Sequence, residues 1–264
     1  MVLYHYTTMQ ALLGILRKEH LCFWGTRYDT MNDPVDYIYA HDIVIPQLLK
    51  SIKDTPFEGH ELVRAFPYIV SFCKSEDDFN MWRMYKSEVS LEINWDIVNE
   101  SFEKEISSTS EKHIYWGDCM YPESHAIPTC FTELFNKAEQ TTNNILDTAQ
   151  ECVTLIKRKE FVNENEFRIF SFDYNLCRAE YNNGNPVFID CEIGNNVKVR
   201  CVKDNDIVLY KEFNLPPNAL SAIMLNISDK QQFEKAKSHL QVYLGQLGYH
   251  VDIKQSVNGL KVRS

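Results

Sequence analysis

Residues 166–174 read EFRIFSFDY and begin the half of the chain that decides the fold. Aromatic and β-branched residues are enriched in strands, and four more strand-like runs follow at short intervals. These runs are PVFID (186–190), VKVRCV (197–202), DIVLY (206–210) and ALSAIML (219–225). Because β-structure concentrates after residue 165, the sequence predicts an α+β fold with a mostly antiparallel sheet rather than a Rossmann alternation.

Beyond this block, the C-terminal segment has the pattern of a helix between two strands. Ser228 and Gln231 form a capping-box pair, which begins a predicted helix that runs through Leu244. Gly245 and Gly248 are typical of a helix end, and YHVDI then has the pattern of a strand. The C-terminus is therefore predicted to be a strand-helix-strand unit.

In the N-terminal half, strand-like and helix-like segments alternate. LYHY at residues 3–6 predicts a strand, and Thr7 or Thr8 can cap the apolar helix that follows. A polar loop, TRYDTMNDP, then ends at Asp33-Pro34, a pair typical of a helix start. Further segments are predicted as the strands PYIVSFC (67–73), EVSLEIN (88–94) and HIYWGDCMY (113–121), a short helix DFNMWRMY (78–85) and a long helix from Thr129 to about Lys159.

The composition is that of one folded domain. The chain has 264 residues, of which 44% are hydrophobic, and neither a repeat nor a Pro/Gly/Ser-rich linker divides it. We expect a single domain over residues 1–264. No run approaches the roughly 18 apolar residues of a membrane span, and the N-terminus lacks the pattern of a signal peptide. We therefore expect a cytoplasmic protein with no membrane partner.

Charge and signature motifs exclude several classes of function. The net charge of −10 opposes charge-driven attraction to nucleic acid or acidic membranes, although a local basic groove stays open. Eight scattered cysteines, mostly in apolar segments and without Cys-x-x-Cys, indicate reduced core thiols, and the eight histidines show no metal-ligand spacing. We expect no metal site. The absence of GxSxG, GxxxxGK[ST] and GxGxxG opposes an α/β-hydrolase, a P-loop NTPase and a Rossmann dehydrogenase.

Three short segments carry the unusual polar residues. His5 alternates with Tyr4 and Tyr6 on a strand, so His5 faces the opposite side from both tyrosines. It is either a histidine satisfied by a backbone partner at a sheet edge or a ligand-binding residue. Trp82 and Tyr85 share one face of a short helix, where they can pack in the core or hold a flat ligand.

The third segment is Glu164-x-Glu166-x-Arg168. Alternation along a strand would place all three side chains on one side, a face that is usually solvated. Two carboxylates at this spacing raise each other's cost of ionisation, and Arg168 can offset that cost. The arrangement could therefore tune a carboxylate that bonds to a hydroxyl group.

Taken in order, these motifs resemble those of a widespread bacterial family of uncharacterised proteins. The residues that carry the resemblance are Tyr4-His5-Tyr6-Thr7, Asn32-Asp33-Pro34, Ser71-Phe72, Met81-Trp82-x-x-Tyr85 and Glu164-x-Glu166-x-Arg168. That family looks like a distant branch of the ADP-ribosyltransferase superfamily. The resemblance implies an ADP-ribosyltransferase-like split sheet with flanking helices.

The resemblance also implies site residues. Glu166 would bind the nicotinamide ribose of NAD, and Glu164 would face the acceptor as the other acid of the pair. His5 would contact the adenosine-side ribose, and Tyr85, with Trp82, would stack near the nicotinamide. The remaining cofactor-binding residues would be Tyr6, Thr7, Ser71 and Arg168.

Three functions follow as hypotheses. The first is an NAD-dependent ADP-ribosyltransferase that uses NAD as substrate and modifies a protein or nucleic-acid acceptor, as a toxin or phage-defence effector, with a possible inhibitory or activating protein partner. The second is a non-catalytic nucleotide-sensing or protein-interaction domain on the same fold. The third is a nuclease or other RNA-directed enzyme that uses His5 and the acidic face, which the negative charge disfavours.

Overall fold

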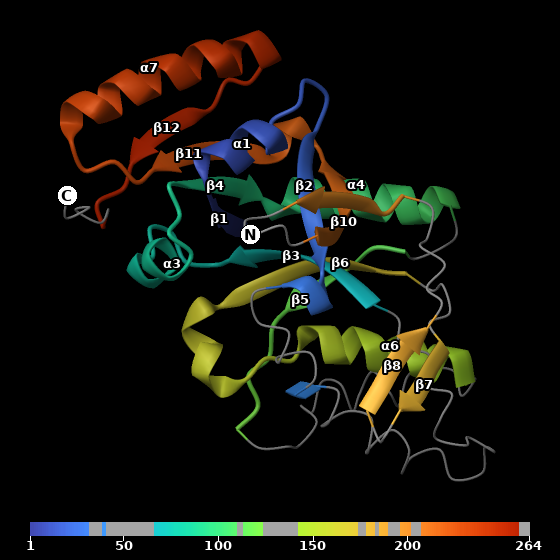
Figure 1. Ribbon diagram of the computed structural model, residues 1–264. Coiled ribbons are helices and arrows are strands. Elements are labelled where there is room, and N and C mark those ends of the chain that lie inside the picture. The colour runs from blue at the N-terminus through green and yellow to red at the C-terminus, as the bar shows by residue number, and fades with distance from the viewer. Residues whose placement is uncertain are drawn as a thin grey trace.

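The computed structural model describes residues 1–31, 39–40, 66–109, 113–123, 142–173, 178–182, 185–189, 196–201 and 207–258 (Figure 1). These residues form an α+β fold around an open, mostly antiparallel sheet, as the strand-rich second half of the sequence predicts. The Asn32-Asp33-Pro34 motif and the first part of the long helix predicted from Thr129 lie outside the described residues. No described helix combines the length and the apolar character needed to cross a membrane.

Within the described residues, ten strands form the main sheet in the order β12-β11-β4-β1-β3-β2-β10-β9, and β6 pairs with both β3 and β5. Only the β11–β12 pair is parallel among the strand pairs described. The strands are β1 Val2–Thr7, β2 Leu21–Arg27, β3 Phe66–Cys73, β4 Val89–Asn94, β5 Tyr115–Asp118, β6 Glu166–Asp173, β9 Lys198–Cys201, β10 Ile207–Leu215, β11 Leu220–Leu225 and β12 Asp252–Gln255. A separate hairpin consists of β7 Arg178–Asn182 and β8 Asn185–Ile189.

The sheet divides at β3. One edge of β3 pairs with β6 along its whole length, from Phe66 to Cys73. The other edge is shared, because β1 pairs with it only at Cys73 and β2 pairs with it at Tyr68 and Ile69. Strands β1 and β2 therefore diverge beside residues 70–72 of β3. This divergence opens the sheet at the place where the functional residues gather.

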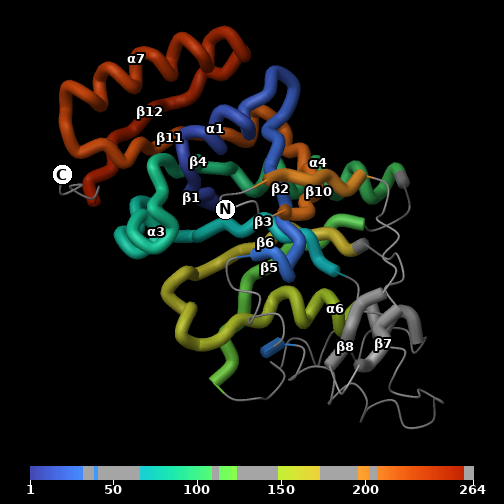
Figure 2. Tube along the Cα trace, in the orientation of Figure 1, coloured from blue at the N-terminus to red at the C-terminus, as the bar shows by residue number. Residues whose placement is uncertain are grey.

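Helices cover the sheet on both sides (Figures 1 and 2). They are α1 Met9–Ile15, α3 Phe79–Met84, α4 Trp95–Thr109, α6 Thr142–Leu155 and α7 Lys230–Leu247, with short 3-10 helices η1 Tyr28–Thr30, η2 Lys159–Glu164 and η4 Pro217–Ala219. Thr8 caps α1 through its Oγ1, which accepts from the Ala11 amide at 3.2 Å. Strand β11, helix α7 and strand β12 form the predicted C-terminal unit.

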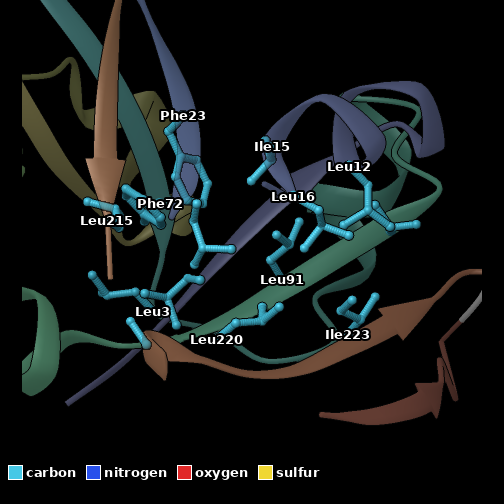
Figure 3. Close-up of a cluster of buried hydrophobic side chains, with 14 of the residues drawn as sticks. Leu3, Leu12, Ile15, Leu16, Phe23, Phe72, Leu91, Leu215, Leu220 and Ile223 are labelled. Carbon is cyan, nitrogen blue, oxygen red and sulfur yellow. The ribbon is translucent and has the colours of Figure 1, made fainter. Parts of the chain in front are cut away.

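The main core lies on the face of the sheet covered by α1, α4 and α7. Leu12 and Ile15 of α1 lie in one cluster with Leu3 and Leu91 of the strands (Figure 3). Phe102 of α4 and Phe233 of α7 belong to the same cluster. Each such side chain contributes about 1.5–3 kcal/mol by leaving water. On the opposite face, α6 covers a second cluster that includes Ile69 and Phe170, and α3 places Trp82 in a third that includes Cys73.

The second and third clusters leave a polar band between them. Along β3 this face presents Ile69, then Ser71, then Cys73, and only the first and the last belong to apolar clusters. Arg168 lies directly opposite Ser71 on β6, and Glu166 lies opposite Cys73. Directly paired residues of antiparallel strands share a face, so both charged side chains join this band.

Two helix predictions need correction. The long helix ends at Leu155 rather than near Lys159, because Ile156 forms a bridge with Met120 and the Lys157 amide donates to the Met120 carbonyl at 2.8 Å. Helix α7 is capped by Asp229 instead of Ser228, since the Asp229 carboxylate accepts from the Gln232 amide.

The end of α7 also differs from the prediction, because the helix continues through Gly245 to Leu247. It stops at Gly248, whose φ of 85° is the left-handed conformation that glycine adopts readily. The sequence pattern also missed β2, β7 and α4 altogether.

Candidate functional site

A cavity of about 720 Å³ lies where β1 and β2 diverge, within the size range of ligand pockets. Segments far apart in the chain form it: β1, β2, β3, the end of α3, η2, β6 and β9. Of the residues predicted for the site, all but Trp82 line this cavity: His5, Tyr6, Thr7, Ser71, Tyr85, Glu164, Glu166 and Arg168.

His5 lies in the split between β1 and β3. Its Nδ1 is 3.0 Å from the Ser71 carbonyl oxygen, and its ring packs edge-on against Phe23 at 5.0 Å. A carbonyl oxygen only accepts, so Nδ1 carries the proton and donates. Burial lowers the pKa of His5, and the Ser71 carbonyl opposes this only in part, which makes the neutral form dominant at pH 7. Nε2 of this tautomer is therefore a hydrogen-bond acceptor, and it has no partner in the described part of the chain.

Tyr6 and Trp82 build one wall of the cavity together. The Tyr6 hydroxyl donates to the Ser75 carbonyl at 2.8 Å, and its ring packs against Trp82 with ring centroids 4.8 Å apart. Trp82 is fully buried, and its Nε1 donates to Asp77 Oδ1 at 2.8 Å. Trp82 thus follows the core-packing alternative and supports the wall from behind.

The two glutamates reach the cavity from different elements. Glu166 begins β6, whereas Glu164 ends η2, so the prediction that both lie on one strand is wrong. Between them Asn165 has a φ of 44°, a left-handed turn that asparagine tolerates. The turn bends the chain, yet both carboxylates contact the same cation. Unlike most such faces, this one is not solvated, because Glu164 and Glu166 are only 7% and 6% exposed.

That cation is Lys157, which the sequence reasoning missed. Its Nζ lies 2.5 Å from Glu164 Oε2 and 2.7 Å from Glu166 Oε2, and its side chain is 7% exposed. Burial alone would lower the pKa of Lys157, but Glu166 and Glu164 outweigh it and raise the pKa. Two neighbouring carboxylates and a single arginine in residues 164–168 of the sequence indicate that a second cation is required if the carboxylates are buried. This requirement does not show which of Lys157, Arg158 and Lys159 supplies it.

Arg168 completes the charge balance. Its Nε donates to Glu166 Oε1 at 2.9 Å, its Nη2 to Glu166 Oε2 at 3.3 Å, and its Nη1 to the Thr154 carbonyl at 2.6 Å. Burial would raise the pKa of Glu166, but Arg168 and Lys157 lower it to about 2. We call Lys157, Glu164, Glu166 and Arg168 the buried quartet. Its two positive and two negative side chains have no net formal charge.

Tyr85 connects α3 to the buried quartet. Its hydroxyl donates to Glu164 Oε1 at 3.2 Å, and burial of that hydroxyl, together with Glu164, raises the pKa of Tyr85. The residue as a whole is 43% exposed, so much of its ring remains accessible beside the cavity. A flat ligand group could therefore stack on Tyr85 without displacing its hydrogen bond.

The far wall of the cavity was not predicted from the sequence. It consists of Trp24 and Thr26 on β2, with Arg200 on β9 and Val208 on β10. Arg200 donates to Thr26 Oγ1 at 3.1 Å and lies over the Trp24 ring. Isolated arginines carry no recognisable spacing, so no motif indicated this wall.

The described cysteines are free thiols, and the described residues form no metal site. Cys22, Cys73, Cys119 and Cys152 are buried free thiols, as predicted, but Cys201 is exposed because β9 lies at the edge of the sheet. The other three cysteines, at positions 130, 177 and 191, lie outside the described residues. Among the residues that the structure describes, no three His, Cys, Asp or Glu side chains come together as a metal site would require.

Comparison of the chain with protein-family models, with curated proteins and with solved structures finds no match in any of the three.

Proposed function

We propose that the cavity binds NAD and that the protein transfers its ADP-ribose to a protein or nucleic-acid acceptor. The observation that carries this proposal is the convergence of His5, Tyr85 and the Glu164–Glu166 pair on one cavity of about 720 Å³. These residues come from three segments up to about 160 positions apart in the chain, and they are those to which the resemblance gives roles in binding and cleaving NAD.

His5 fits the role of a ribose-binding residue. A sugar hydroxyl donates readily to a neutral imidazole nitrogen, and Nε2 is available because Nδ1 is held by the Ser71 carbonyl. The lowered pKa keeps this acceptor unprotonated at physiological pH. In the proposed complex His5 accepts from the adenosine-side ribose.

Glu166 fits the role of the residue that stabilises the transition state. Breaking the bond to nicotinamide develops positive charge on the ribose, and a fixed carboxylate favours that state over the ground state. With a pKa of about 2, Glu166 is ionised at neutral pH, and Arg168 and Lys157 hold it in place. Such fixed groups stabilise a transition state without a cost for reorganisation.

The two glutamates differ in how many further hydrogen bonds they can accept, and this difference indicates which substrate group each one binds. A carboxylate offers about four lone-pair positions. Glu166 already accepts from Arg168 at both oxygens and from Lys157, which leaves room for a single hydroxyl group. In the described part of the chain Glu164 accepts from Lys157 and Tyr85 alone, so it keeps more capacity. Glu164 is therefore proposed to face the acceptor, and Glu166 the 2′-hydroxyl of the nicotinamide ribose.

The proposal is tested by following label transfer from radiolabelled NAD to the macromolecules of a cell lysate. We expect transfer by the wild-type protein and a loss of at least about 100-fold in Glu166→Gln. Glu160→Gln is the matched control, because Glu160 is exposed on η2 and lies outside the cavity. Digestion of the labelled material with protease or nuclease identifies the acceptor class. The proposal fails if no condition gives transfer.

A second candidate is a nucleotide-sensing domain that binds without turnover. The observation in its favour is the closed state of the buried quartet, in which each glutamate is less than 8% exposed and already hydrogen-bonded. This candidate predicts saturable nucleotide binding with no release of nicotinamide. Its binding would persist in Glu166→Gln.

A further inference from the structure

Arg200 and Lys86 are basic residues of the cavity that the proposed reaction does not use, and of the two Lys86 is exposed whereas Arg200 is partly buried. Arg200 extends from the edge strand β9 back across β10, and its Nη2 donates to Thr26 Oγ1 at 3.1 Å. Its guanidinium lies 5.4 Å from the centroid of the Trp24 ring and 5.8 Å from that of the Tyr210 ring. A hydroxyl and two aromatic rings therefore fix its position in the cavity wall.

Among the residues that the structure describes, no carboxylate pairs with Arg200. Lys198, two residues earlier on the same strand, pairs with Glu212 at 2.6 Å, whereas Arg200 has no ion pair within the described structure. The Nε of Arg200 is buried and has no hydrogen-bond partner there. Burial also lowers the pKa of Arg200, and the nearby Tyr210 opposes this shift only in part. An unpaired guanidinium in a cavity wall is unexpected in a chain with a net charge of −10.

The donors that Arg200 leaves free suit an anionic group with several oxygens. Thr26 occupies a single N–H of the five that a guanidinium presents, so the other N–H groups of Nη1 and Nη2 remain for a ligand, whereas Nε is buried. A planar guanidinium binds phosphate through two parallel hydrogen bonds, and stacking on aromatic rings reduces the entropy lost on binding.

Arg200 lies far enough from the buried quartet that a ligand contacting both must be extended. Thr26, which Arg200 contacts, lies on β2, whereas Glu166 and Arg168 lie on β6. These two strands flank β3 on opposite edges, so they are two strand spacings, roughly 10 Å, apart. A dinucleotide is long enough to contact both.

We infer that Arg200, with Thr26, Trp24 and Tyr210 as its support, forms a phosphate-binding subsite for a nucleotide ligand. The identification of that phosphate as the pyrophosphate of NAD rests on the function proposed above. The subsite itself requires only a nucleotide that carries phosphate groups.

Calorimetry of ADP and adenosine binding tests the subsite, because these probes share the nucleoside and differ in the phosphates. We expect ADP to bind at least about 10-fold more tightly than adenosine to the wild-type protein, and increasing salt to weaken ADP alone. Arg200→Gln should remove this preference, and Arg200→Lys, which keeps the charge without the planar fork, should restore part of it. Arg17→Gln, an equal change of charge at an exposed position outside the cavity, should leave the preference intact.

The outcomes separate the subsite from the proposed function. An ADP preference that survives in a folded Arg200→Gln protein overturns the subsite, and so does equal affinity of the wild-type protein for ADP and adenosine. An Arg200-dependent ADP preference without any nicotinamide release from NAD keeps the subsite and overturns the transferase. Release of nicotinamide that is lost in Glu166→Gln, without an ADP preference in the wild-type protein, supports the transferase and overturns the subsite.

Discussion

At the scale of single residues, Lys157 holds the site together. It is the shared partner of two buried carboxylates, and breaking a buried ion pair from one side leaves the other side without compensation. We expect Lys157→Met to lower the free energy of unfolding by about 3–5 kcal/mol, measured by urea denaturation. Lys159→Met is the control, because Lys159 forms an exposed pair with Glu123. Equal stability of the two variants would contradict the role given to Lys157.

The pH dependence of stability follows from Glu166. Its pKa falls from an ordinary value of 4.5 to about 2 on folding, despite burial, because Arg168 and Lys157 stabilise the carboxylate. The unfolded chain therefore binds this proton more readily than the folded chain does. The stabilisation is complete above pH 4.5 and is lost as the pH falls from 4.5 towards 2. Unfolding free energies measured across this range should fall more steeply for the wild-type protein than for Glu166→Gln, and parallel curves would refute the assignment.

At the level of residues, the sequence predicted one side of the cavity but neither its far wall nor Lys157. His5, Tyr85, Glu164 and Glu166 were found because they form short patterns in the chain. Lys157 and Arg200 belong to no pattern, since each meets its partners only through folding. The burial of Glu164 was not predicted either. Alternation along a strand shows which side of the sheet a side chain faces, but it does not show which other elements cover that side.

At the scale of secondary structure elements, replacing each of two glycines by alanine is expected to change stability in opposite directions. A Cβ atom at Gly25 of β2 would lie 2.3 Å from the Phe213 ring of β10, whereas one at Gly245 of α7 would meet nothing within 4 Å. Gly25→Ala should therefore destabilise the protein by about 1–3 kcal/mol through overpacking. Gly245→Ala should stabilise it by up to about 1 kcal/mol, because alanine favours the helix. Thermal unfolding of both variants checks the pair, and shifts of the same sign would contradict the packing of β2 against β10.

Asp77 joins helix α3 to the end of the described chain. Its carboxylate accepts from Trp82 Nε1, from the Ser256 hydroxyl and from the Val257 amide. Asp77→Asn keeps a residue that tolerates the φ of 49° at this position but removes the charge. We expect a loss of about 1–3 kcal/mol and faster amide hydrogen exchange in α3. Asp252→Asn, an exposed aspartate on β12, should leave both unchanged, and an identical response of the two variants would oppose this role.

The sequence predicted those elements whose apolar residues form a continuous run or repeat with the period of a strand or a helix. Strand β3 was found as a continuous apolar run, and helix α3 was found as a short helical segment between two strands. Strand β2 was missed because its apolar run LCFW ends at Gly25 and the residues after it were assigned to the loop TRYDTMNDP. The end of the long helix was misplaced because the bridge between Ile156 and Met120 is a tertiary contact.

At the scale of the whole molecule, the site depends on the division of the sheet at β3. The strand pairs with β6 on one edge and with both β1 and β2 on the other, and the cavity occupies the space between the last two. The α7–β12 unit and helix α6 lie at opposite ends of the molecule, and the divided sheet connects them (Figure 2). Patterns in the sequence predicted an antiparallel sheet, but a strand with three partners arises from long-range pairing that no local pattern encodes.

The central claim is that this cavity cleaves NAD through Glu166. The most direct test measures the rate of nicotinamide release from NAD, with lysate as a source of acceptor, by wild-type protein, Glu166→Gln and Glu160→Gln. The account predicts release by the wild-type protein and Glu160→Gln, and a rate lower by at least about 100-fold for Glu166→Gln. Release at the wild-type rate by a folded Glu166→Gln protein, or no release by any of the three, would contradict it.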